Sequence, residues 1–85
     1  MPVRETAGKR INPIKLKQMQ EQAEELEARI AELESEIQQS ELALSDFVNA
    51  DEAVRLSNLL ESRRSQLERA MAEWETVAAE LEATA

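Results

Sequence analysis

Apolar residues recur at alternating intervals of three and four along two long stretches of the chain, which is the pattern of a coiled-coil seam. The first stretch contains Leu16, Met19, Ala23, Leu26, Ile30, Leu33 and Ile37. The second contains Leu56, Leu60, Leu67, Ala70, Trp74, Val77 and Leu81. Each seam runs along one side of a helix and needs a second helix to cover it. The 85-residue chain is therefore predicted to be all-α, with two long helices forming an antiparallel coiled-coil hairpin.

Helix-capping residues mark where both helices begin. Asn12 followed by Pro13 is typical of a helix start, because Asn caps the first turn and Pro needs no hydrogen-bond partner there. Asn49 with Glu52 three residues later predicts a capping box. A turn this short makes the two helices antiparallel. We predict a hairpin domain over 12–83, with helices at 13–47 and 50–82, a turn at 48–49, and a flexible basic linker at 1–11.

One register brings the two seams together along their whole length. In it, the residue numbers of each facing pair add up to 100, as in Leu26 with Trp74 and Ala23 with Val77. The register sets Arg63 opposite Ile37, next to a layer that contains Ser40. Arg63 is predicted either to direct its charge out to Glu36 or Glu41, or to lock the register; Trp74 is predicted to lie in the core. Two flanking ion pairs are also predicted: Glu34 with Arg64, and Arg29 with Glu73.

The net charge of −8 is distributed unevenly along the chain. Residues 1–17 hold five cations and one acid, whereas residues 18–85 hold five cations and seventeen acids. A basic lead-in of this kind can follow the phosphates of a nucleic acid, and it can equally be a solvated linker. The candidate nucleic-acid contacts are the cations Lys9, Arg10, Lys15 and Lys17 of the lead-in, with Arg55, Arg63, Arg64 and Arg69 of the second helix.

The sequence contains none of the residue constellations that catalysis needs. It has no cysteine and no histidine, and Gly8-Lys9 is not a phosphate-binding loop. Its carboxylates follow helical spacing, which is typical of a solvated acidic face and not of a metal site. We expect no enzyme activity, no catalytic residue, and no metal or cofactor in this domain. No apolar run is long enough for a membrane span, and a cytoplasmic protein is expected.

A resemblance to a known family covers about residues 9–82. It is carried by the Lys/Arg-rich lead-in 9–17, the repeat at 26–34, the capped turn, and Glu73-Trp74-Glu75 near the end of the second helix. This arrangement resembles the C-terminal coiled-coil domain of ABC-F subfamily ATP-binding cassette ATPases. The resemblance implies a parent with two ATPase cassettes that bind ATP and magnesium, no membrane domain, and a role in translation or antibiotic protection on the ribosome. It also implies that the hairpin is an accessory arm contacting ribosomal RNA or DNA, with the lead-in cations as the phosphate-contacting segment.

Two other functions remain open from the sequence alone. The hairpin could be a protein–protein interaction module, either packing on the cassette domains of its parent or dimerising, because Leu42, Leu59 and Met71 fall outside the seam. We expect a monomer, with a dimer as the alternative. The hairpin could also be a tRNA-binding arm of a synthetase, but such arms tend to be basic along the rod.

Overall fold

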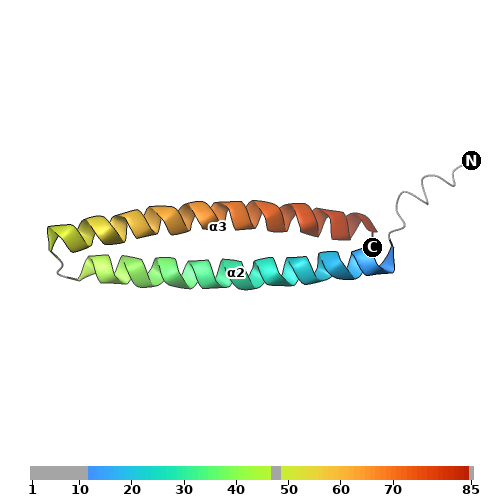
Figure 1. Ribbon diagram of the computed structural model, residues 1–85, viewed down its shortest axis with the longest axis horizontal. Coiled ribbons are helices and arrows are strands. Elements are labelled where there is room, and N and C mark those ends of the chain that lie inside the picture. The colour runs from blue at the N-terminus through green and yellow to red at the C-terminus, as the bar shows by residue number, and fades with distance from the viewer. Residues whose placement is uncertain (1–11, 47–48, 85) are drawn as a thin grey trace, which may run out of the picture.

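A computed structural model of the chain describes residues 12–46 and 49–84. Helix α2 (Pro13–Ser45) and helix α3 (Ala50–Thr84) lie side by side and run in opposite directions, with the turn at one end (Figure 1). The predicted all-α helical hairpin is confirmed, and within the described ranges there is no strand. Helix α3 has 35 residues, which corresponds to a rod about 50 Å long.

Both helices begin at the predicted asparagine caps. The side-chain oxygen of Asn12 accepts a hydrogen bond from the backbone N–H of Ile14 at 2.8 Å, and Pro13 occupies the first helical position. The side-chain oxygen of Asn49 accepts a bond from the backbone N–H of Glu52, also at 2.8 Å. The second half of the predicted capping box is not found among the described residues. The Glu52 carboxylate instead accepts hydrogen bonds from Arg55, one turn further along α3.

The helix ends differ slightly from the sequence prediction. Helix α2 ends at Ser45, because Asp46 takes an extended conformation with φ −84° and ψ 169°, whereas the sequence predicted an end at 47. Helix α3 continues to Thr84, two residues past the predicted end at 82, since no glycine or proline there stops it. The predicted linker 1–11 and Val48 of the predicted turn at 48–49 lie outside the described residues.

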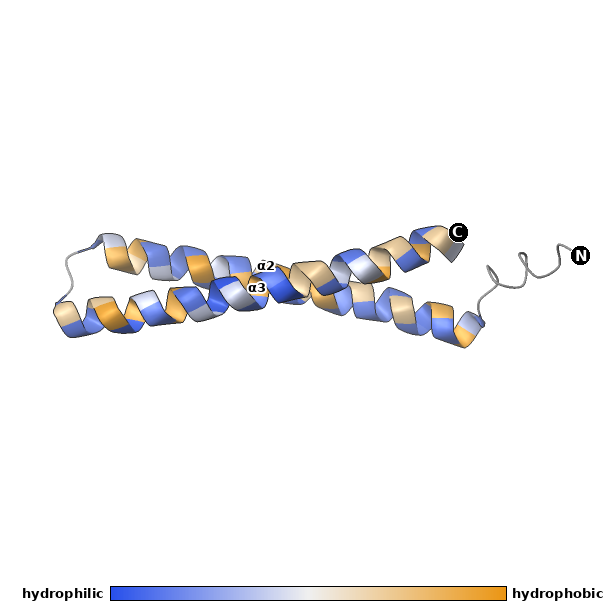
Figure 2. Cartoon of the chain, turned by 90° about the horizontal axis from the view of Figure 1, so that it is seen from above, coloured by the Kyte–Doolittle hydropathy of each residue, from blue (hydrophilic) through white to orange (hydrophobic). Residues whose placement is uncertain are grey.

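Within the ranges that the structure describes, the buried side chains all come from the two predicted seams. At the end of the rod nearest the termini, Met19, Ala23 and Val77 form a buried cluster against which Leu26, Trp74 and Leu81 pack. These are the three facing pairs that the register predicts for this end. Leu33, near the middle of α2, is fully buried at 0% exposure. Apolar residues recur along both helices with polar residues between them (Figure 2), so the core is one narrow strip between two solvated faces.

Neither α2 nor α3 contains a stretch apolar enough to cross a membrane, over the residues that the structure describes.

Candidate functional site

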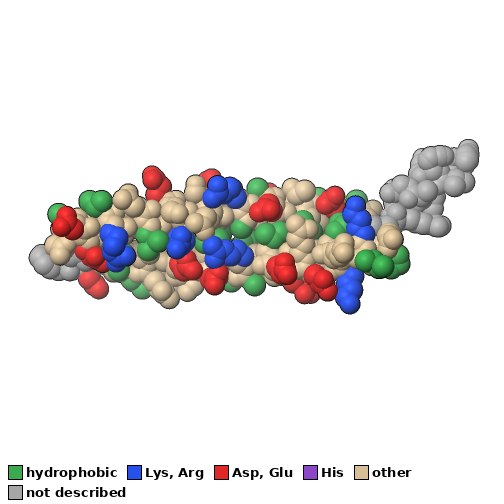
Figure 3. Space-filling model, in the orientation of Figure 1, with side chains coloured by type: hydrophobic (Ala, Val, Ile, Leu, Met, Phe, Trp, Pro, Cys, Tyr) green, Lys and Arg blue, Asp and Glu red, His purple; other side chains and the backbone are tan. Residues whose placement is uncertain are grey.

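The candidate cations do not form one cluster. Lys15 and Lys17 lie in the first turns of α2, at the end of the rod from which the lead-in departs. Lys9 and Arg10 lie outside the described residues. The four arginines of α3 are spread from the end nearest the turn towards the middle of the rod. On the face shown in Figure 3, Lys and Arg side chains lie along the junction of the two helices in the half of the rod nearest the turn, with carboxylates beside them.

Arg63 lies in the seam and directs its charge to the rim, as one of the two sequence interpretations predicts. Its Nε donates to Glu36 Oε1 of the opposite helix at 2.6 Å. Both side chains are about one-third exposed, at 31% and 38%. The long aliphatic stem can therefore occupy the layer opposite Ile37 while the guanidinium keeps contact with both water and a carboxylate. Ser40, in the next layer, is buried at 7% exposure.

The two flanking ion pairs predicted from the register are wrong in their partners. Arg64 donates to Glu41 at 2.6 Å and not to Glu34. Side chains on α3 lean towards its N-terminus, which lies at the turn, so Arg64 reaches the glutamate one heptad closer to the turn. Arg29 likewise bonds Gln66 at 2.8 Å in place of Glu73.

Arg29 reaches Gln66 because its own helix holds its guanidinium in place. The guanidinium pairs with Glu32, one turn further along α2 and closer to the turn of the hairpin. An i,i+3 pair of this kind directs the cation along the helix axis, away from Glu73. The register itself is unaffected, since both misassigned cations still contact the opposite helix on the expected flank of the seam.

Arg55 also forms an ion pair, in this case with Glu52 of its own helix. It donates to the Glu52 carboxylate through Nε and a terminal nitrogen. This hydrogen bond lowers the pKa of Glu52 below its usual value, with the opposite charge of Arg55 adding to the effect, and the same contact raises the pKa of Arg55. Glu52 is in the first turn of α3, where the positive end of the helix dipole also favours a carboxylate.

Four of the five arginines in the described part of the chain are therefore ion-paired with glutamates: Arg29, Arg55, Arg63 and Arg64. Over residues 12–46 and 49–84, Lys15, Lys17 and Arg69 have no such partner. A phosphate group would have to compete with a carboxylate for the paired arginines. Of the candidate contacts in the described ranges, Lys15, Lys17 and Arg69 are those that a phosphate could approach without displacing a carboxylate.

A small apolar pocket on the hairpin surface was not predicted from the sequence. Its volume is about 280 Å³ and its lining comprises Ile30, Met71 and Trp74, with Glu27 and Glu75 as the polar members. The indole Nε1 of Trp74 donates to Glu27 Oε2 at 3.0 Å across the two helices. Trp74 was expected in the core; it packs against the core cluster, but it is only partly buried and also lines this pocket. The one feature of the sequence that could have indicated this pocket was Met71, an apolar residue outside the seam and one helical turn from Trp74.

A second, larger groove lies on the same flank of the seam, closer to the turn. It is about 600 Å³ in volume, open to solvent, and lined by Glu41, Leu44, Ser57, Leu60, Arg64 and further polar residues. The Arg64–Glu41 ion pair lies across it. Within the described ranges, no group of histidine, cysteine, aspartate and glutamate side chains is arranged to hold a metal ion.

The three predicted off-seam residues do not form one apolar strip. Leu42 is 61% exposed and Met71 is 44% exposed, whereas Leu59 is half-buried. Leu59 and Met71 are twelve positions apart, which places them on opposite flanks of the α3 seam, because a helix turns by about 100° per residue. Comparison with known proteins gives no further assignment: no protein family, no curated protein and no solved structure matches this chain.

Proposed function

We propose that the chain is a non-catalytic accessory arm of a larger cytoplasmic protein, in the manner of the C-terminal hairpin of ABC-F ATPases, and that it assists contact with ribosomal RNA or DNA. The arm binds through its lead-in cations Lys9, Arg10, Lys15 and Lys17 and not through the shaft. The parent's cassettes, with their ATP and magnesium, supply any hydrolysis. The observation that supports this assignment is that, among residues 12–46 and 49–84, Lys15 and Lys17 have no ion-pair partner, whereas four of the five arginines are paired.

The distribution of charge supports binding at one end of the rod. Between them, residues 18–28 and 70–84 hold eight carboxylates and no cation. This part of the rod repels phosphate and directly follows Lys17, so contact at this end of the rod is confined to the lead-in cations. Binding through these cations weakens as salt is raised. The logarithm of the binding constant falls with the logarithm of the salt concentration, with a slope close to the number of phosphates neutralised.

A titration with two charge-matched variants tests this function. Labelled single-stranded RNA and duplex DNA are titrated at about 50 mM salt, where phosphate contacts are strongest. One variant replaces Lys9, Arg10, Lys15 and Lys17 with Gln; the other replaces Arg29, Arg55, Arg64 and Arg69 with Gln. Both lose four positive charges, so the overall repulsion is the same. We expect the lead-in variant to lose about tenfold or more in affinity and the shaft variant to lose much less.

Two results would contradict the proposal. The first is no binding by the wild-type chain, and the second is an equal loss in both variants, which would reflect net charge alone. The relation to ABC-F proteins has its own check, because the coding sequence around this segment must encode two ATPase cassettes upstream of it.

A protein–protein interaction module is the second candidate, favoured by the exposure of four large apolar residues: Ile14, Leu42, Val54 and Met71. In this case the hairpin packs on the cassette domains of its parent or forms a dimer, for which the seam residues could also pair between two chains. Sedimentation at micromolar concentration separates the two candidates. We expect a monomer, and a dimer would favour the interaction module.

A further inference from the structure

The flank of the hairpin that holds the Trp74 pocket also carries two rows of glutamates. On α3 the row has a spacing of seven residues, which is nearly two full turns, so that its members share one side of the helix. The row on α2 has the same spacing. All seven side chains are exposed. We call this surface the acidic face, and it comprises Glu27, Glu34 and Glu41 of α2 with Glu61, Glu68, Glu75 and Glu82 of α3.

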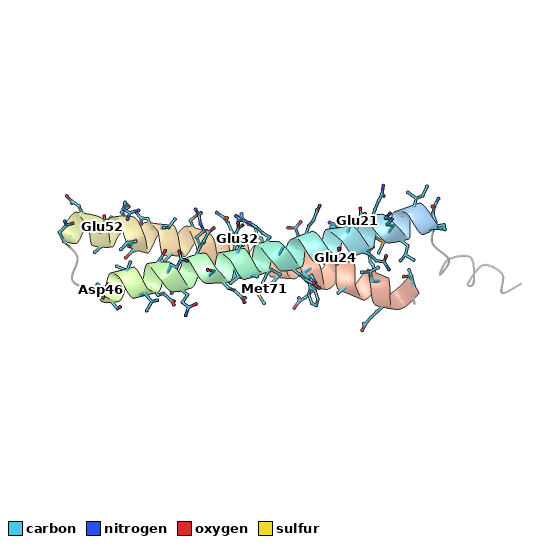
Figure 4. All side chains as sticks on the ribbon, turned by 90° about the horizontal axis from the view of Figure 1, so that it is seen from below. Glu21, Glu24, Glu32, Asp46, Glu52 and Met71 are labelled. Atoms are coloured by element: carbon cyan, nitrogen blue, oxygen red, sulfur yellow. The ribbon has the colours of Figure 1, made fainter. Side chains whose placement is uncertain are left out.

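Both surface depressions open on the acidic face. Glu27 and Glu75 line the Trp74 pocket, one from each row. Glu41, Glu61 and Glu68 line the larger groove. Among the described residues, Arg64 is the only cation that lines either depression, and its charge is already balanced by Glu41. In Figure 4, Met71 of this face lies on the opposite edge of the hairpin from Glu32 and Glu52, which pair with arginines.

The Trp74 pocket suits one long side chain and not a small-molecule ligand. Its 280 Å³ falls below the range of about 300–1,000 Å³ that is usual for small-molecule sites. The indole offers a face for a cation, and the flexible thioether of Met71 adapts to differently shaped apolar groups. Glu27 and Glu75 can neutralise a positive charge at the mouth. The bond from Trp74 Nε1 to Glu27 already holds the indole in place, which reduces the entropy lost on binding.

We propose that the acidic face docks a lysine- and arginine-rich segment of a partner protein, with one arginine or lysine side chain seated against Trp74 in the pocket. The aliphatic stem of that residue packs on Ile30 and Met71, and its charge lies between Glu27 and Glu75. A symmetric pairing of two acidic faces would bring like charges together, so a second copy of this chain fits the surface poorly. Nucleic acid is repelled for the same reason.

Trp74 provides the readout, since it is the only tryptophan in the sequence. The probe is a short peptide of arginine, alanine and leucine, and the matched control peptide has glutamate in place of each arginine. We expect the basic peptide to shift and quench the Trp74 fluorescence of the full chain in a saturable way, and salt to weaken the effect. The acidic peptide is expected to leave the fluorescence unchanged.

Two pairs of variants locate the binding site. Glu27→Gln with Glu75→Gln removes both charges at the pocket but keeps an oxygen that can accept the Trp74 hydrogen bond. Its control, Glu73→Gln with Glu80→Gln, removes the same charge outside the acidic face. Met71→Ser is compared with Leu42→Ser, which changes an exposed apolar residue elsewhere. We expect the pocket variants to lose about fivefold or more in affinity for the basic peptide and the controls less than about twofold.

The proposal is overturned by equal loss in pocket and control variants, by an equal response to the acidic peptide, or by no response to the basic one. It is also overturned if self-association of the chain, followed by sedimentation, accounts for the fluorescence change. The proposed nucleic-acid contact does not share these outcomes, because it depends on the lead-in cations and not on this face.

Discussion

The Nε of Arg63 donates to Glu36 Oε1 at 2.6 Å, from a core position of the coiled coil. The arginine thus provides a charge in a layer where the hydrophobic pattern calls for an apolar side chain opposite Ile37. The pair is only partly exposed, at 31% and 38%, so the cost of desolvating two charges largely offsets its attraction. The ion pair therefore adds less to the free energy of unfolding than an apolar side chain in the same layer would.

Replacing Arg63 with Met should stabilise the hairpin. Met fills the layer opposite Ile37 without a charge to desolvate, and we expect the free energy of unfolding to rise by about 0.5–1 kcal/mol in urea titrations. Glu36→Gln, which leaves the arginine and removes the charge of its partner, should lower it by about 0.5–1 kcal/mol. A fall in stability on Arg63→Met would show that the ion pair itself holds the hairpin together.

Leu33→Ala should be among the most damaging single substitutions in the seam. Leu33 is the fully buried side chain at 0% exposure, and its truncation should cost about 2–4 kcal/mol. A two-helix hairpin of this size has little stability to spare, so circular dichroism should show a partly unfolded chain at room temperature. The matched control is Leu42→Ala, at 61% exposure, for which we expect a change below about 0.5 kcal/mol.

A pair of cysteines should report the register directly, since the chain has none of its own. Ala23 and Val77 belong to the same buried cluster, so Ala23→Cys with Val77→Cys should oxidise to an intramolecular disulfide. Ala23→Cys with Ala70→Cys places the second thiol one heptad away and should not. Mobility on non-reducing gels, with mass spectrometry, measures both. A disulfide in the second variant, or a dimer in the first, would contradict the register.

The seam and its register were predictable from the sequence, whereas the ion pairs were not. The positions of Ala23, Leu33 and Val77 follow from heptad spacing, which is a property of the backbone and fixes which residues face the partner helix. The partners of Arg29 and Arg64 depend on where long, exposed side chains lean, and several carboxylates lie within reach of each. The Trp74 pocket depends on the shapes and conformations of five side chains from two helices. The heptad spacing predicts which residues face the partner helix but not how these side chains fit together.

Asn49→Ala should destabilise the start of α3. The side-chain oxygen of Asn49 accepts the 2.8 Å bond from the Glu52 N–H, and loss of a helix N-cap costs about 1 kcal/mol. Asn49→Asp should retain the cap, since a carboxylate accepts the same bond and interacts favourably with the helix dipole. Hydrogen exchange of the first amides of α3 should show faster exchange in the alanine variant only. Equal exchange in both variants would mean that the cap contributes nothing.

Glu52→Gln should change the acid dependence of stability in a defined direction. The Arg55 hydrogen bond lowers the pKa of Glu52 in the folded chain below its unfolded value, so the stabilisation is fully present above the unfolded pKa. It is lost as the pH falls through the lowered folded pKa. The wild type should therefore exceed the variant in stability at about pH 7, and the difference should shrink by about pH 3. Thermal unfolding at both pH values measures this difference in stability. The control is Glu61→Gln, because Glu61 has no ion pair among residues 12–46 and 49–84. The interpretation would be wrong if the difference stayed constant across this range or grew towards acid.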